Sequence, residues 1–581
     1  MAEQIPAAAV EAPRARPATA RLWAAAAAAS WTLLCLRWFD AAAPLRPRIV
    51  SLLPPWLLAA SFVLAAAVWW TRRERTDRAP WWRDQRLLLV VALAVLFRLP
   101  LAWQGAAGYV TADGALSGLM ALDVRDGRDH AVFVPHVPYS GSLKAHLTAP
   151  LAMAMDAARA FALVSVLFYA AFVAALFRLA SAAAGPSRPL VPLAAGLYAA
   201  FAPAFVTRYS LSNDGNYVEV LAFGTWALVS ALRWVEAPAA RPRQAWAMGI
   251  LLGLAFWAHI LAVIPAAAIA AFLALDAPRR ALMAAPRMAA GFVLGDLPGL
   301  LWNAANGGDS FAYLRPGAVV SAEGTHDGLL RRAATLVADH LIVLLGYDFG
   351  YPPPIDRALK VAAAVALVAV VVGIARAARR VRGESGRPWR LLLLFTAVNL
   401  LIAVLALPYI PGNPRYLLFL MAALPVFLAD ALAGGRGRAL LAAMVAVNAV
   451  ASLAQGAVTM MSDARWRALV KGLEDDGVRW CYTDFYLATK INFLSEQRVI
   501  CSAKLGPTTI EYFFRFRDAV ERAPEAALVA VNATSAEKLE RHLDRLGIKY
   551  RRHDLMKPVL FGLSRKVDPE ELFPERAFPL R

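Results

Sequence analysis

The feature that most constrains the fold is a series of twelve apolar runs, each near the ~20 residues that a helix needs to cross a bilayer. The runs lie at 22–38, 50–70, 87–103, 158–180, 190–206, 217–235, 246–275, 288–302, 359–375, 391–410, 415–433 and 439–459. Of the 581 residues, 59% are hydrophobic and 18% charged, whereas soluble domains carry about 25% charged residues. The sequence therefore excludes a purely soluble protein and predicts a polytopic α-helical membrane protein.

Arginine-rich connections between these runs predict the orientation. The stretches 72–86 and 376–390 carry six arginines each, and further arginines lie at 241, 243, 279, 280, 287, 436 and 438. Positive loops stay in the cytoplasm. From Asp463 onward the chain has 21 basic and 18 acidic residues, so the net charge of +19 belongs mostly to the membrane part. The charge thus indicates topology, and we expect no nucleic-acid partner.

The run 246–275 has arginines on both sides, so we expect two short helices that turn near residues 259–265. About 13 spans result, with the N-terminus in the cytoplasm and the C-terminus outside. Arg37, Arg46 and Arg48 conflict with this scheme, because they lie in a loop on the predicted outer side. The first apolar run lacks a small-residue cleavage site and is predicted to be a retained helix.

Three regions are predicted: an N-terminal membrane hairpin with a basic loop (1–85), a transmembrane domain (86–461) and a C-terminal α/β domain outside the membrane (462–581). Two long outer loops, 104–157 and 303–358, join the C-terminal domain on that side, and loops this long usually carry function. In the C-terminal domain we expect helices at 463–476, 485–494, 510–522 and 536–546 and strands at 479–483, 499–502, 528–532, 549–553 and 559–563.

The three cysteines are too few for a disulfide framework, and none has the spacing of a zinc site. Cys481 and Cys501 lie at strand candidates separated by one helix. Parallel packing would place them side by side in an oxidising compartment, which predicts a disulfide. The alternative is two buried free thiols in the core.

In the first outer loop, Asp113 follows a membrane helix by about ten residues and precedes an amphipathic turn. This position places a carboxylate at the membrane surface, where it can accept a proton from an attacking hydroxyl. The alternative is an N-cap role for the helix that begins at Gly114.

Three short motifs carry a resemblance to a known family. The first two are Asp113-x-Ala-x-x-Gly-x-Met120 and Pro138-Tyr-x-Gly-Ser-Leu143, and the third is Asn413-Pro-Arg-Tyr416 before a late helix. Together with the hydrophobic pattern from about Arg86 onward, they resemble GT-C fold membrane glycosyltransferases, which include protein mannosyltransferases and the lipid A aminoarabinose transferase.

The resemblance implies that Asp113 is the catalytic base or orients the acceptor. Relatives often have a second acid next to it, but here Gly114 follows, so a divalent cation is not indicated at this loop and no cofactor is required. The resemblance also implies a polyprenyl-phosphate sugar donor and a lipid, glycan or protein acceptor, in the inner membrane of a bacterium.

A departing phosphate needs cations close to it. The candidates that bind substrate are Lys144, His146, Arg208, Asp214, Tyr217, Glu219, Arg315 and Arg415. The two arginines Arg208 and Arg415 have an alternative role, in which they extend to lipid headgroups at helix ends. His259 is expected to be a packing residue.

The sequence thus predicts an inverting glycosyltransferase that acts on the outer face of the membrane. The alternative is a transporter or flippase of a lipid-linked substrate. Transporters place their ionisable residues at the bilayer midplane, whereas the polar clusters here lie at the predicted outer helix ends, which favours the enzyme.

Overall fold

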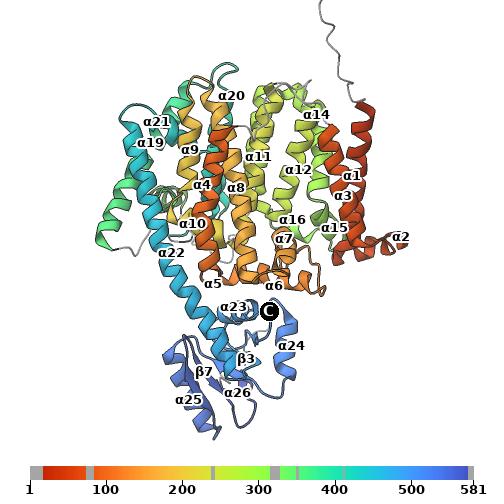
Figure 1. The fold of residues 1–581 in the computed structure, drawn as a ribbon, viewed down its shortest axis with the longest axis vertical. Helices are drawn as coiled ribbons and strands as arrows, with labels where there is room; N and C mark the ends of the chain where they lie inside the picture. Colours follow the sequence, from red (N-terminus) through yellow and green to blue (C-terminus); the bar gives the residue numbers. More distant parts are fainter. Residues whose placement is uncertain are drawn as a thin grey trace, which may run out of the picture.

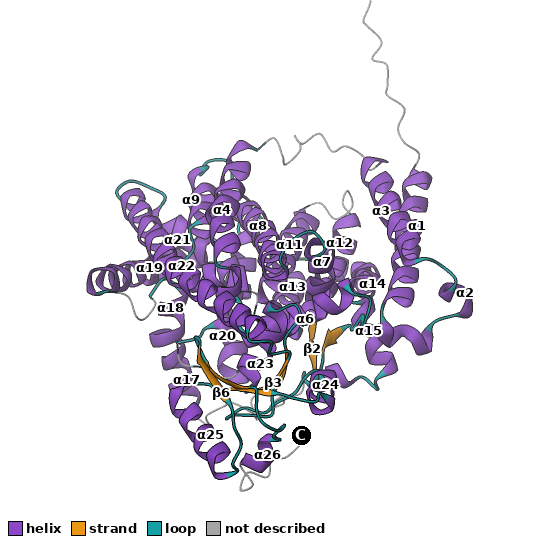
Figure 2. Cartoon of the chain, turned by 60° about the horizontal axis from the view of Figure 1, so that its bottom comes forward, coloured by secondary structure: helices purple, strands orange, loops and turns teal. Residues whose placement is uncertain are grey.

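The computed structural model describes residues 17–572 except 73–83, 213, 237–241, 315–327, 348–351, 408–409 and 411. Helices form the membrane part and a small sheet lies in the C-terminal domain (Figures 1 and 2). The elements of the first part of the chain, up to residue 312, are α1 (Pro17–Trp38), η1 (Asp40–Leu45), α2 (Arg48–Ser51), α3 (Pro55–Arg72), α4 (Gln85–Gln104), α5 (Ala106–Tyr109), α6 (Ala112–Arg125), β1 (Phe133–Val134), β2 (Val137–Gly141), α7 (Leu143–Ala152), α8 (Ala157–Ala184), α9 (Leu190–Ala200), α10 (Ala204–Ser212), η3 (Asp214–Asn216), α11 (Tyr217–Glu236), α12 (Pro242–Ala258), η4 (Ile260–Ala262), α13 (Val263–Asp276), α14 (Pro278–Gly295), α15 (Leu297–Ala305) and α16 (Asp309–Ala312).

The remaining elements complete the bundle and form the C-terminal domain. They are α17 (Leu329–Thr335), the π-helical turn η5 (Leu336–Leu341), α18 (Ile342–Leu344), α19 (Pro353–Arg379), α20 (Arg387–Ala406), η6 (Arg415–Ala422), α21 (Leu424–Leu432), α22 (Gly437–Asp475), β3 (Trp480–Tyr482), α23 (Phe485–Leu494), β4 (Ile500–Ser502), α24 (Phe514–Arg522), β5 (Ala527–Val529), α25 (Ala533–Arg545), β6 (Arg551–Asp554), β7 (Pro558–Phe561) and α26 (Pro569–Leu572).

Within the described ranges, six helices are long and apolar enough to cross a membrane, and the number reaches eight if each bent pair is one span. The bent pairs are α9 with α10 (68°) and η6 with α21 (49°). Large apolar side chains such as Leu96, Val361 and Val368 are more than 60% exposed on the bundle surface, as expected for helices that face lipid. The prediction of a polytopic helical protein is confirmed, and the count of 13 spans stays a prediction.

The run 246–275 is broken as expected. Helix α12 ends at Ala258, and α13 begins at Val263 after a short 3-10 turn. Helix α12 packs along α14 through two glycine pairs, Gly249 with Gly253 and Gly291 with Gly295, where an added Cβ would overlap backbone of the facing helix. Small residues four apart allow such close approach between membrane helices.

The connection between α19 and α20, which carries arginines, lies at the end of the bundle opposite the C-terminal domain (Figure 1). Buried Asp430 pairs with Arg188 and Arg380. At the same end, Asp276 accepts a hydrogen bond of 3.0 Å from Arg390. These carboxylates fix the arginine-rich connections to neighbouring helices.

The N-terminal hairpin explains why arginines are found in its loop. The Arg37 Nε donates to the Leu53 carbonyl oxygen at 3.1 Å, and the Arg46 Nε donates to that of Leu36 at 2.7 Å. Both arginines thus bind backbone carbonyls that lack helical partners. Arg37 and Arg46 therefore stabilise the hairpin loop itself. This loop lies at the end of the bundle that also carries Asp113.

The C-terminal sheet has the strand order β4-β3-β5-β7-β6. Strand β3 is parallel to β4 and β5, whereas β7 is antiparallel to β5 and β6. Cys481 and Cys501 are direct partners on β3 and β4, with Cα atoms 4.4 Å apart, and the structure joins them in a disulfide. The expected strands and helices are present in this domain.

One helix connects the membrane part with the C-terminal domain. The sequence predicts two helices, at 439–459 and 463–476, but α22 is continuous over 39 residues. The proposed boundary at residue 462 therefore falls inside a helix. In Figure 1, α22 runs from the bundle into the domain without a linker.

Candidate active site

Asp113 lies in the first turn of α6 with a side chain that is 57% exposed. Thr111 is the N-cap of this helix, and its Oγ1 accepts a hydrogen bond from the Gly114 N–H at 3.2 Å. The alternative capping role for Asp113 is therefore wrong. Because Thr111 supplies the cap, the Asp113 side chain is not used as the cap and stays largely exposed at the N-terminal end of α6.

Asp214 brings a second carboxylate to the same helix end. The Thr111 hydroxyl donates to Asp214 Oδ1. This oxygen also lies 3.6 Å from the position that a Cβ of residue 114 would occupy. The second acid that the loop sequence lacks beside Asp113 is thus supplied in space by the α10–α11 turn, and a Cβ at position 114 would press on the Ser212 carbonyl oxygen, at 3.2 Å, in front of it.

Two arginines face these acids. The Arg415 Nη1 lies 3.9 Å from Asp113 Oδ2, and its Nη2 donates to the Tyr416 hydroxyl at 3.0 Å. Arg208 is half-buried, with its guanidinium 5.1 Å from the Tyr209 ring centroid. Both arginines interact electrostatically with Asp214. The structure therefore brings two acids and two cations together, from α6, α10, the α10–α11 turn and η6.

Lys144 and Glu219 lie behind this group. The Lys144 side chain is 1% exposed, its Nζ donates to Ser165 Oγ, and the same Nζ is 3.6 Å from the Phe161 ring centroid. Glu219 is fully buried in the first turn of α11 and interacts with Lys144. These two side chains interact electrostatically inside the protein.

His146 is apart from the site. Its ring packs on Phe39 at 4.9 Å and on Trp38 at 6.3 Å. It therefore contacts the N-terminal hairpin, on a different face of α7 from Lys144. Arg315 lies outside the described residues.

Aromatic residues surround the acids and arginines. The Tyr217 ring lies 5.2 Å from His259 and 6.0 Å from Tyr416, and Tyr139 lies 5.5 Å from His259. His259 is buried, and its Nδ1 accepts a hydrogen bond from the Leu261 N–H, which agrees with the predicted packing role.

Sequence reasoning missed Thr111, Tyr139 and Asn216. Asn216 has a positive φ of 58°, and its Nδ2 donates to Ser140 Oγ, to the Gly141 oxygen and to the Ala258 oxygen at 3.1, 2.6 and 3.1 Å. It ties β2, the α10–α11 turn and α12 together. The pair Gly215-Asn216 is a signal for a left-handed turn, and it could have identified this residue.

Among the residues that the structure describes, no group of three or more histidine, cysteine or acidic side chains is arranged to hold a metal ion. The positive charge of the site comes from Arg208 and Arg415. Because a guanidinium presents a planar fork of donors, it can bind a phosphate through two hydrogen bonds.

No protein-family model and no curated protein matches the sequence. Among solved structures, the chain is similar to apo ArnT from Cupriavidus metallidurans, with a TM-score of 0.58 and 11% identity over 81% of this chain and 97% of that one. The same ArnT bound to undecaprenyl phosphate gives a TM-score of 0.56 and 10% identity over the same shares. The archaeal oligosaccharyltransferase AglB from Archaeoglobus fulgidus gives 0.47 and 12%, over 78% and 70%. The chain therefore has the GT-C fold of membrane glycosyltransferases, as the sequence resemblance predicted.

Proposed function

We propose that this protein is an integral membrane glycosyltransferase that transfers a sugar from a polyprenyl-phosphate donor to an acceptor hydroxyl. The observation that carries the proposal is the exposed Asp113 carboxylate 3.9 Å from the Arg415 guanidinium, at a helix end of a GT-C fold. The solved structure of ArnT with undecaprenyl phosphate supports a lipid-linked donor.

In the proposed reaction, the acceptor oxygen attacks the anomeric carbon of the donor sugar while Asp113 accepts the hydroxyl proton. The bond from the anomeric carbon to the phosphate oxygen breaks, and its electron pair stays on the phosphate. Arg415 and Arg208 neutralise that charge. A single displacement inverts the anomeric configuration, with no covalent enzyme intermediate and no metal required.

Asp214 has a positioning role in this scheme. It accepts the hydroxyl of Thr111, the residue that caps α6, and interacts with both arginines. Asp214 thus fixes the position of the α6 N-terminus relative to the two arginines. The polar residues gather at one end of the bundle, an arrangement that favours surface chemistry over a transport path through the midplane.

We propose that this end faces the periplasm or cell exterior of a bacterium. The paired arginines around Asp430 and Asp276 lie at the opposite end, which the positive-inside rule assigns to the cytoplasm. An impermeant thiol reagent should label a cysteine at exposed position 537 in intact spheroplasts and leave one at exposed position 382 unlabelled. Labelling in the reverse pattern would contradict the orientation.

Complementation of a deletion strain tests the function. Mass spectrometry should show a lipid-linked sugar that accumulates in the deletion strain and disappears with the wild-type gene. We expect Asp113→Asn to lower transfer by at least about a hundredfold, the scale for loss of a general base, with unchanged thermal unfolding. Asp309→Asn, an exposed acid of α16, is the matched control.

Two results would contradict the proposal. Near-normal transfer by Asp113→Asn would remove Asp113 as the base. Loss of activity in EDTA with recovery in Mg²⁺ or Mn²⁺ would show that a cation, and not the two arginines alone, neutralises the phosphate.

A further inference from the structure

Two tyrosines, Tyr139 and Tyr512, lie close enough to Asp113 to interact with it electrostatically, and a third, Tyr313, packs on Tyr139. Tyr139 belongs to β2, Tyr313 follows α16, and Tyr512 precedes α24. The rings of Tyr139 and Tyr313 have centroids 4.7 Å apart. All three side chains are half-buried. We call them the tyrosine group, and only Tyr512 comes from the C-terminal domain.

Tyr512 reaches the group because α24 lies next to the first loop. Its ring centroid is 6.3 Å from that of His136, between β1 and β2, and His136 also contacts Phe514 at 5.2 Å. Figure 2 shows α24 beside β2. Burial raises the pKa of Tyr139 to about 12, and the nearby Tyr313, Tyr512 and Asp113 act in the same direction. Tyr139 therefore keeps its hydroxyl proton at neutral pH.

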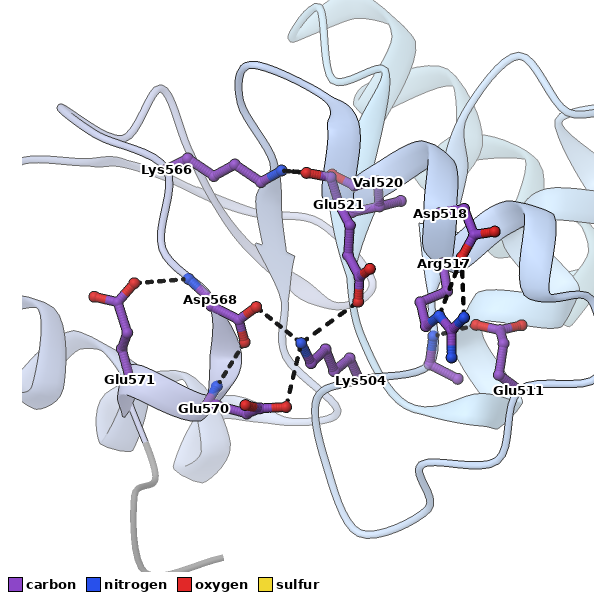
Figure 3. Close-up of polar contacts among 11 residues, drawn as sticks. Lys504, Glu511, Arg517, Asp518, Val520, Glu521, Lys566, Asp568, Glu570 and Glu571 are labelled. Carbon is purple, nitrogen blue, oxygen red and sulfur yellow. Dashed lines mark hydrogen bonds and ion pairs between the residues drawn. The ribbon is translucent and has the colours of Figure 1, made fainter. Parts of the chain in front are cut away.

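The segment that carries Tyr512 is fixed at several points. The Ala503 N–H donates to Glu511 Oε2 at 3.1 Å, and the Phe485 N–H donates to the Thr508 oxygen at 2.9 Å. The Phe485 ring then packs on Tyr512 at 5.3 Å. Figure 3 shows Glu511 with its hydrogen bond next to α24. Tyr512 is thus positioned by the domain framework.

A second cluster holds the start of this segment. Lys504 Nζ lies 2.8 Å from Asp568, 3.3 Å from Glu570 and 3.5 Å from Glu521 (Figure 3). It joins the end of the chain to α24. Lys504 and Glu511 hold the chain on the N-terminal side of Tyr512, and α24 begins at Phe514 on the other side. Little conformational entropy therefore remains to be lost when a ligand binds Tyr512.

The chemistry of the tyrosine group matches a carbohydrate. A tyrosine offers an apolar ring face and a polar hydroxyl, and a sugar offers C–H faces and hydroxyls in alternation. The arginines that suit a phosphate lie in η6 and α10, whereas Tyr512 lies in the C-terminal domain, so the two ends of the site differ in chemistry. An acyl chain would gain nothing from three phenolic hydroxyls.

We infer that Tyr139, Tyr313 and Tyr512 form the acceptor subsite and that the acceptor is a saccharide. This inference rests on the proposed function, because Asp113 must then receive the proton of a sugar hydroxyl. In this inference Tyr512 is a binding residue. The C-terminal domain contributes it to a site that otherwise belongs to the membrane domain.

The test uses the full-length protein in lipid nanodiscs and saturation-transfer NMR. The probes are trisaccharides of hexose, N-acetylhexosamine and pentose, together with a Ser/Thr-rich peptide. We expect at least one trisaccharide to bind and Tyr512→Ala to weaken its binding by about tenfold, the scale of one lost aromatic contact. Tyr313→Ala, from the membrane domain, should act similarly, and Tyr550→Ala, which changes a half-buried tyrosine next to the edge strand β6, should have no effect.

Binding of undecaprenyl phosphate separates the two proposals. Tyr512→Ala should leave it unchanged. If the wild type fails to bind undecaprenyl phosphate but binds a trisaccharide through Tyr512, the proposed function is wrong, whereas the tyrosine group stands as a saccharide-binding site. Binding of the peptide alone, no trisaccharide binding, or trisaccharide binding that neither tyrosine variant weakens would overturn the subsite.

Discussion

Arg515 of the C-terminal domain binds both carboxylate oxygens of Asp123 in α6, at 2.8 and 2.7 Å. Asp123 is 2% exposed and also accepts from Arg128 at 3.1 Å. Asp113 lies in the first turn of α6, and Asp123 lies in the last turn of the same helix. The contact therefore couples the position of the C-terminal domain to the helix that presents the proposed base.

Arg515→Ala should loosen the domain from α6. Since Arg128 still donates to the Asp123 carboxylate, we expect the free energy that holds the domain against α6 to fall by about 1.5–3 kcal/mol, the contribution of hydrogen bonds to a charged group. Hydrogen exchange should increase in α6 and α24 and stay unchanged in the α12–α14 pair. Arg541→Ala, exposed on α25, is the control, and equal exchange in both variants would contradict the coupling.

Gly253→Leu should separate α12 from α14. The glycine faces the carbonyl of Phe292 so closely that any Cβ must displace backbone, and membrane helices that meet through small residues depend on this approach. We expect a lower thermal unfolding midpoint in detergent. Ala281→Leu, half-buried in α14, serves as the comparison, and an equal midpoint in both proteins would argue against the glycine contact.

Cys481 and Cys501 should resist alkylation in the denatured, unreduced protein. In the chain-entropy model, closing a loop of about 20 residues stabilises the domain by roughly 3 kcal/mol. Reduction should therefore lower the denaturant midpoint of the domain. Peptide mapping that finds both thiols modified without reduction would show two buried free cysteines, and Cys35 supplies an internal reference for a free thiol.

Protonation of Glu511 should change the stability of the Tyr512 segment. Burial raises its pKa to about 7 from the usual 4.5, against hydrogen bonds from the Ala503 and Phe513 N–H groups that lower it. The folded state therefore binds this proton more tightly than the unfolded state, and stability falls as the pH rises from about 4.5 to 7.

Hydrogen-exchange protection of residues 503–513, corrected for intrinsic rates, measures this effect. It should fall between pH 5 and 8 in the wild type and change less in Glu511→Gln. Glu537→Gln, an exposed acid of α25, should keep the wild-type profile. The same slope in Glu511→Gln would assign the dependence to other groups.

Much of the fold could be predicted because it depends on local patterns. Apolar runs of span length predicted the membrane helices, and short alternating segments predicted the C-terminal strands. The continuous α22 was missed because polar residues after Ser462 indicate a boundary by composition, although a helix can pass from lipid to water without a break. Strand order depends on contacts far apart in sequence and could not be read from the pattern.

The site could be predicted only in part, because its residues come from distant positions in the sequence. Asp113 and Arg415 are 302 positions apart, and only the resemblance to GT-C enzymes associated them before the structure did. The sequence pattern did not distinguish Lys144 from His146, although side chains two positions apart on one helix point about 200° from each other. The structure turns Lys144 toward α8 and His146 toward the N-terminal hairpin.

Because α22 is unbroken, the number of residues in it determines the angle at which the C-terminal domain faces the membrane domain. At 3.6 residues per turn and 1.5 Å per residue, one residue inserted near Ser462 would rotate the domain by about 100° about the helix axis. Tyr512 would then move away from Tyr139, and Arg515 away from Asp123. Four inserted residues would restore the facing surfaces to within about 40° but lift the domain by about 6 Å. The length of this helix therefore sets the distance between the C-terminal domain, with its Tyr512, and the membrane bundle.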